Sequence, residues 1–117
     1  MLSFSGGLKI FVALEPCDMR KSFNGLHTAV QEKLRADPLS GALYLFSNKK
    51  RNLMKILYWD GSGLWVLAKR LEKGTVSWPV SASDASDKIA LTPQALAMLT
   101  DGIELKDGMT RAWYEKS

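Results

Sequence analysis

The first apolar segment of the chain is an almost unbroken run over residues 8–14, interrupted only by Lys9. It contains the β-branched residues Ile10 and Val12. Two glycines precede it and Glu15-Pro16 follows it. Short apolar runs bounded by turn-forming residues are typical of β-strands. Residues 8–14 are therefore predicted to form the first strand.

The period of the apolar positions then changes to that of a helix. Apolar residues at spacings of three and four, the period of one face of an amphipathic helix, occur at Phe23, Leu26, Val30 and Leu34. Asp18 is a candidate N-cap, because short polar side chains accept hydrogen bonds from the free amide groups of a first turn. Asp37-Pro38 predicts the end of the helix, since the residue before a proline is pushed out of the helical region.

Between residues 42 and 78 the pattern becomes a series of short apolar segments separated by polar turns. Four segments rich in aromatic and aliphatic residues are predicted to be strands, over residues 42–47, 53–59, 64–71 and 75–78. The connections between them are short and polar, and the second and third contain glycine. Such connections join antiparallel neighbours, so this part of the chain is predicted to form an antiparallel β-meander.

The last part of the chain contains one further predicted element. Residues 81–88 are rich in Ser, Ala and Asp and are interpreted as a loop. Thr92 then offers a capping hydroxyl before Pro93, which suits the first helical position, and Gly102 offers a stop. These signals predict a short C-terminal helix. Residues 106–117 are a possible tail.

Length and composition complete the fold prediction. The chain has 117 residues, 46% of them hydrophobic, which is enough for one core and too little for two ordinary domains. We therefore predict a single α+β domain over residues 1–117, with an N-terminal strand and helix, an antiparallel β-meander and a short C-terminal helix. No apolar run approaches the roughly 20 residues of a membrane span, and the N-terminus does not have the pattern of a signal peptide.

Cysteine and histidine usage limits the chemistry that the chain can carry. Cys17 and His27 are the only residues of their types, so an intrachain disulfide and a zinc site built from Cys and His are excluded. A reducing, cytoplasmic location fits, and no metal or cofactor is predicted. Both residues are interpreted as structural, so no catalytic residue is predicted. The remaining enzymatic alternative is a metal-dependent nuclease that uses Glu104 and Lys106, a weak three-residue pattern.

The charge is concentrated in the middle of the chain. The formal net charge is +4, but residues 18–74 hold eleven basic and five acidic residues, a net charge of +6. Residues from 75 onward hold four basic and six acidic residues, a net charge of −2. A basic segment of this kind attracts polyanions. The partner that the charge favours is therefore a nucleic acid.

A predicted strand register brings part of this charge together. If the turn at residues 60–63 pairs Trp59 with Leu64, then Lys55 faces Ala68 and lies diagonally from Arg70. The face would then be basic and aromatic, suited to phosphates and to unpaired bases. The candidate DNA-binding residues are Arg20, Lys21, Lys49, Lys50, Arg51, Lys55, Lys69 and Arg70. The alternative is that the aromatic residues belong to the core and the lysines only solvate a sheet edge.

Several sequence blocks, in order along the chain, carry a family resemblance. The first are Asp18-Met19-Arg20-Lys21, Phe23, Gly25-Leu26, Asp37-Pro38 and Ser40-Gly41. The next are Phe46, Lys55, Trp59-Asp60, Gly63, Lys69-Arg70-Leu71-Glu72, Gly74 and Trp78-Pro79. The last are Leu91-Thr92-Pro93, Leu99 and Gly102-Ile103. In these blocks the chain resembles the TnpB accessory-protein family of the insertion-sequence sixty-six group.

The resemblance implies a bacterial mobile-element protein that is encoded beside a transposase and a second small accessory protein. Such a protein is needed for transposition but does not supply the catalytic carboxylates. Together with the basic segment, this predicts a non-enzymatic accessory protein that binds transposon DNA. The alternative is an adaptor that docks on the transposase or on the other accessory protein through an apolar sheet surface containing Trp59 and Trp65.

Overall fold

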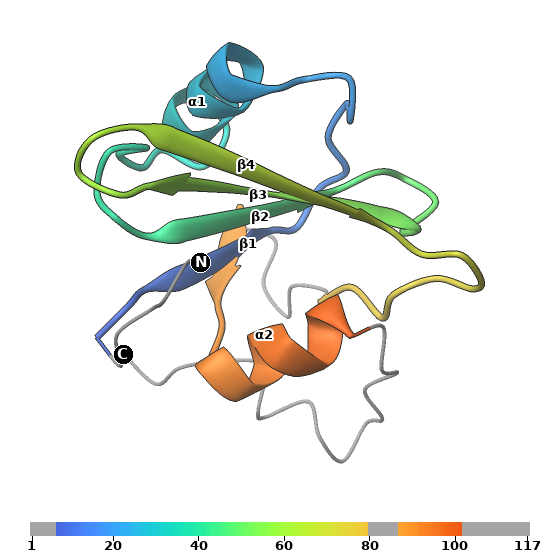
Figure 1. Cartoon of the computed structure of the whole chain (residues 1–117). Coiled ribbons are helices and arrows are strands. Elements are labelled where there is room, and N and C mark those ends of the chain that lie inside the picture. Colours follow the sequence, from blue (N-terminus) through green and yellow to red (C-terminus); the bar gives the residue numbers. More distant parts are fainter. Residues whose placement is uncertain (1–6, 80–86, 102–117) are drawn as a thin grey trace.

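A five-stranded sheet with the strand order β4-β3-β2-β1-β5 lies between two helices, one on each face (Figure 1). The computed structural model describes residues 7–79 and 87–101. The elements are β1 (Ile10–Ala13), α1 (Phe23–Glu32), β2 (Leu43–Ser47), β3 (Leu53–Trp59), β4 (Leu64–Arg70), β5 (Lys88–Ala90) and α2 (Pro93–Thr100). The predicted α+β class is confirmed.

The core lies on both faces of the central strand β2, whose five residues are all buried. Side chains alternate between the faces of a sheet, so this continuous apolar strand needs cover on both. Leu43 and Leu45 pack in a cluster with residues of α2. Tyr44 and Phe46 pack in a second cluster with residues of α1. The two helices are therefore held to the sheet by alternate residues of the same strand.

The antiparallel order β2-β3-β4 agrees with the predicted meander, and so does its register. Trp59 pairs with Leu64 and Lys55 with Ala68, as expected. The first strand joins this meander differently, because β1 is parallel to β2 and antiparallel to β5. The sheet is therefore mixed.

Two predictions for the segments after β4 are wrong. Residues 75–78 are not a strand; Val76 donates a single backbone bond to the Arg51 carbonyl at 2.8 Å, and the Trp78 indole donates to the Ala13 carbonyl at 2.8 Å. Those contacts hold the segment across the end of the sheet and not along an edge. Lys88, predicted to end a loop, instead begins β5. Residues 80–86 and 102–117 lie outside the described residues, including Gly102 and the possible tail.

The helices begin and end differently from one another. Thr92 caps α2 as predicted, accepting a hydrogen bond from the Ala95 amide at 3.1 Å. Asp18 does not cap α1, because it lies five residues before Phe23, the first residue of the helix, and its carboxylate is bonded to Arg20. The helix ends at Glu32, before the predicted stop, and Arg35 takes a left-handed φ of 51°. Neither helix in residues 7–79 and 87–101 is long and apolar enough to cross a membrane.

Candidate nucleic-acid interface

The fold brings most of the predicted basic residues to one end of the sheet. At this end lie the segment before α1, the turn between β2 and β3, and the end of β4 (Figure 1). The Cys17 amide donates to the Ser47 carbonyl at 2.8 Å, which fixes the first segment beside the turn. Arg70 pairs with Leu53, the first residue after that turn. We call this group the basic end: Arg20, Lys21, Lys49, Lys50, Lys55, Arg70 and Lys73.

Lys49 and Lys50 are exposed at the tip of the β2–β3 turn. The turn is held from inside by Asn48, whose carboxamide oxygen accepts from the amides of Asn52 and Leu53 at 3.1 and 3.2 Å. The Asn48 amide group also donates to the Asn52 side chain at 2.6 Å. Because these side chains satisfy the turn, neither lysine is needed to hold it. Within residues 7–79 and 87–101, neither ammonium group has a carboxylate partner.

Arg51, in the same turn, has a different environment. Its φ of 59° is left-handed, and its guanidinium turns inward, where Nη2 donates to the Leu14 carbonyl at 3.1 Å. The guanidinium also lies 5.2 Å from the centroid of the Trp78 ring, a cation–π contact. Burial lowers the pKa of Arg51 because it removes water from the charged group. These contacts give Arg51 a structural role in joining the turn to residues 14 and 78.

Lys55 lies on the face of β3 that α1 covers. Its ammonium donates to the carbonyl of Lys21 at 2.8 Å, so it ties the sheet to the segment just before the helix. The Lys21 side chain in turn lies over Gly25, where an added Cβ would stand 2.9 Å from the Lys21 Cβ. The close approach of Lys21 to the first turn of α1 therefore depends on glycine at position 25.

Arg20 is exposed but already paired. Its guanidinium forms an ion pair with the Asp18 carboxylate, with Nη2 2.8 Å from Oδ2 and Nε 3.1 Å from both oxygens. This bonding lowers the pKa of Asp18 to about 2 and raises that of Arg20. Above that pKa, Asp18 offsets the charge that Arg20 adds to the basic end.

Lys69 is separated from the other candidates by the alternation of the strand. It neighbours Arg70 in sequence, but successive side chains of β4 point to opposite faces. The Lys69 ammonium donates to the carbonyl of Thr100 at the end of α2, on the other face of the sheet from α1. Lys73, which sequence reasoning counted but did not select, is exposed in the loop after β4. Its position three residues after Arg70 is the signal that could have identified it.

The expected basic and aromatic surface is not continuous. Lys55 and Trp59 share a face of β3, but Leu57 between them is fully buried beneath α1. Tyr58 and Trp59 are both half-buried. Phe23, which the helical period assigned to the core, is instead 47% exposed at the first position of α1. Phe23 is therefore the aromatic residue nearest in sequence to Arg20 and Lys21, although the helical period predicted that it would be buried.

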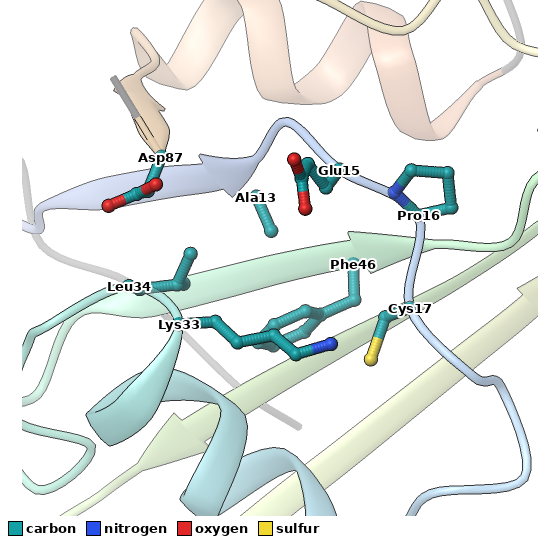
Figure 2. A pocket seen from close by; sticks show the side chains of 8 residues that line it. All are labelled: Ala13, Glu15, Pro16, Cys17, Lys33, Leu34, Phe46 and Asp87. Carbon is teal, nitrogen blue, oxygen red and sulfur yellow. The ribbon is translucent and has the colours of Figure 1, made fainter. Parts of the chain in front are cut away.

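A small cavity lies between α1 and the sheet (Figure 2). Its volume is about 30 Å³, and it is lined by Ala13, Glu15, Pro16, Cys17, Lys33, Leu34, Phe46 and Asp87. That volume suits about one water molecule, whereas sites for small organic ligands hold several hundred Å³. In the described part of the chain, no three His, Cys, Asp or Glu side chains are placed to hold a metal ion. Glu104 and Lys106 lie outside the described residues.

Comparisons with known proteins give consistent results. A family model described as IS66 Orf2 like protein matches residues 8–109. Two uncharacterized proteins of Sinorhizobium fredii, y4jC and y4hO, are each 35% identical to the chain over 104 residues. The matches cover 89% of this chain and 86% and 88% of the two relatives. No solved structure matches the chain.

Proposed function

Because this chain belongs to the IS66 Orf2-like family, we propose that it is a non-enzymatic accessory protein of insertion-sequence transposition that holds transposon DNA by its phosphates. It acts in the cytoplasm, where it positions the DNA for the transposase. The observation that carries the proposal is the basic end, where exposed cations from separate parts of the chain gather at one end of the sheet.

The charges of Lys49, Lys50 and Arg70, which are exposed, are available to a polyanion. Among residues 7–79 and 87–101, the only ion pair joins Arg20 to Asp18, so Lys49, Lys50 and Arg70 have no carboxylate partner there. Lysine and arginine side chains that neutralise phosphates release the counterions bound to DNA, which favours binding at low salt. Contacts of this kind position a protein on DNA without reading its sequence. Lys55 supports DNA binding indirectly, because its hydrogen bond positions the backbone of Lys21. Arg51 does so by fixing the β2–β3 turn through its bond to the Leu14 carbonyl.

The test is a mobility-shift titration on transposon-end DNA and on unrelated DNA at several salt concentrations. If three to five phosphates are neutralised, the logarithm of the binding constant falls with the logarithm of salt with a slope of about −3 to −4.5. The double variant Lys49→Ala/Lys50→Ala is expected to weaken binding to both DNAs and to flatten the slope by about 2. A flat salt dependence of the unaltered protein would contradict the proposal.

A matched control removes the same charge elsewhere. Lys9→Ala/Lys33→Ala changes two exposed lysines outside the basic end and is expected to leave most of the DNA affinity in place. Equal losses from the two double variants would show that only net charge matters and would overturn the assignment of the surface. Cleavage of the DNA after addition of magnesium or manganese would contradict the non-enzymatic function and favour the nuclease alternative.

A second candidate function is that of an adaptor for the transposase or the other accessory protein. It is favoured by the exposure of Trp65, which is 46% exposed on β4, whereas Trp59 is half-buried. Binding through such an aromatic anchor would survive high salt and would be lost in Trp65→Ala but not in Lys49→Ala/Lys50→Ala. Pull-down of the purified transposase at low and high salt separates this function from DNA binding.

A further inference from the structure

The edge of the sheet formed by β4 has no partner strand in the described part of the chain. β4 is the last strand in the order β4-β3-β2-β1-β5, and it is seven residues long (Figure 1). An edge strand presents a row of backbone N–H and C=O groups that can pair with another chain. The short edge strand β5, at the other side of the sheet, has three residues.

The hydrogen bonds between β3 and β4 show which backbone groups face outward. The Leu71 amide donates to the Asn52 carbonyl at 2.9 Å, and the Asp60 amide donates to the Gly63 carbonyl at 3.1 Å. Bonded and non-bonded pairs alternate along an antiparallel ladder, so the odd-numbered residues of β4 bond to β3. The residues whose N–H and C=O point to the outer edge are Leu64, Val66, Ala68 and Arg70.

Two odd-numbered residues of β4, Trp65 and Leu67, form an exposed apolar surface on the face opposite α1. Trp65 is 46% and Leu67 37% exposed. The Trp65 indole donates to the Asp60 carboxylate at 2.8 Å, which fixes its orientation on the surface. A groove of about 200 Å³ opens beside them, lined by Met54, Ile56, Leu67, Ala68, Lys69 and Thr100.

We propose that two copies of this chain associate through β4, antiparallel and centred on Leu67, to form one continuous sheet. This register places outward-facing residues opposite each other, Val66 against Ala68 and Leu64 against Arg70 of the second copy. All seven residues of both strands then overlap, and every outward N–H and C=O group gains a partner.

The side chains are complementary in the same register. Leu67 meets Leu67 of the second copy at a non-hydrogen-bonded pair, where opposed side chains approach most closely. Trp65 lies opposite Lys69 of the second copy, a cation–π pairing beside the apolar groove that Lys69 helps to line. No lysine or arginine opposes another. Lys69 and Arg70, which lie at one end of β4, therefore do not block this antiparallel pairing.

Sedimentation of the full chain without DNA tests this association independently of the proposed DNA binding. The mass is expected to rise with concentration from 13.0 kDa to twice that value. Leu67→Lys, which opposes two lysines at the centre, is expected to raise the dissociation constant at least about tenfold. The control Leu39→Lys changes a leucine that is 46% exposed far from β4 in sequence, and it should leave association unchanged. A mass of 13.0 kDa at all concentrations would overturn the proposal.

Disulfide cross-linking tests the register without relying on a disruptive charge. Leu67→Cys places two thiols at a non-hydrogen-bonded pair, where Cα atoms stand about 4.5 Å apart, within the range of a disulfide. Mild oxidation is expected to give a covalent dimer that reductant reverses. Ala68→Cys, one residue along the same strand, opposes Val66 and should cross-link poorly. More cross-linking at 68 than at 67 would exclude pairing centred on Leu67.

Discussion

β2 and β4 are both rich in aromatic and aliphatic residues, but their surroundings are opposite. All five residues of β2 are buried, whereas five of the seven residues of β4 are exposed. β2 has a strand on each side and a helix against each face, whereas β4 has one neighbouring strand among residues 7–79 and 87–101. Apolar composition alone therefore does not distinguish a core strand from an edge strand. The position in the sheet decides which residues stabilise the fold and which can contact a partner.

The largest expected effect tests this contrast directly with one substitution in each strand. Leu45→Ala removes a fully buried side chain from the cluster beneath α2 and is expected to lower the free energy of unfolding by about 3–4 kcal/mol. Leu67→Ala in β4 is expected to lower it by about 1 kcal/mol or less. Urea denaturation at low protein concentration, where self-association contributes little, measures both values. Equal losses would remove the distinction between the two strands.

A smaller effect is expected within the β2–β3 turn, where inward and outward cations are neighbours. Arg51→Asn keeps a residue that tolerates the left-handed backbone but removes the bond to Leu14 and the contact with Trp78. It is expected to lower the free energy of unfolding by about 1–2 kcal/mol. Lys50→Asn is expected to change it by no more than about 0.5 kcal/mol. A similar loss in Lys50→Asn would show that the exposed lysine is also structural.

The smallest effect concerns Trp65 on β4 and the carboxylate of Asp60 to which its indole is bonded. Asp60 accepts from the indole of Trp65, from the amide and hydroxyl of Ser62 and from the amide of Gly63, which together hold its pKa well below 3.8. Trp65→Phe removes the indole bond, so the pKa of Asp60 should rise toward its ordinary value. NMR titration of the Asp60 carboxyl carbon measures this shift. An unchanged pKa would show that Ser62 and Gly63 set it without the indole.

The pH dependence of stability follows from the same group. Because the pKa of Asp60 is lower in the folded state, its contribution is fully present above its ordinary pKa and is lost as the pH falls through the folded value. The difference in melting temperature between the unaltered protein and Trp65→Phe should therefore narrow in acid. A difference that stays constant with pH would assign the effect of Trp65 to packing and not to the carboxylate.

The sequence predicted best what depends on neighbouring residues. The bounds of β3, the register across the turn at Asp60 and the cap at Thr92 all follow from local patterns. The same patterns missed β5, because three residues carry almost no periodicity, and they placed Phe23 in the core, although it begins its helix beyond the cover of the sheet.

In the candidate site, too, features set by neighbouring residues were predictable and features set by distant contacts were not. The gathering of cations near residues 49–55 and 70 is visible in the sequence as local charge, and the fold brings them to one end of the sheet. The sequence does not show that the Arg51 side chain points inward. That orientation depends on a positive φ and on contacts with Leu14 and Trp78, which are far away along the chain. The separation of Lys69 from Arg70 was in contrast implicit in the alternation of a strand.

The position of β1 between β2 and β5 also affects how the protein can fold during its synthesis. Val12 pairs with Leu45 on one side and with Ile89 on the other, so the first strand is complete only when one of the last described elements has been made. Closure over so long a loop is slow compared with hairpin formation. On the ribosome, the meander is expected to form early while the apolar face that receives α2 stays uncovered. The sheet can therefore close only after residues 88–90 have left the ribosome, and not when β1 to β4 alone have emerged.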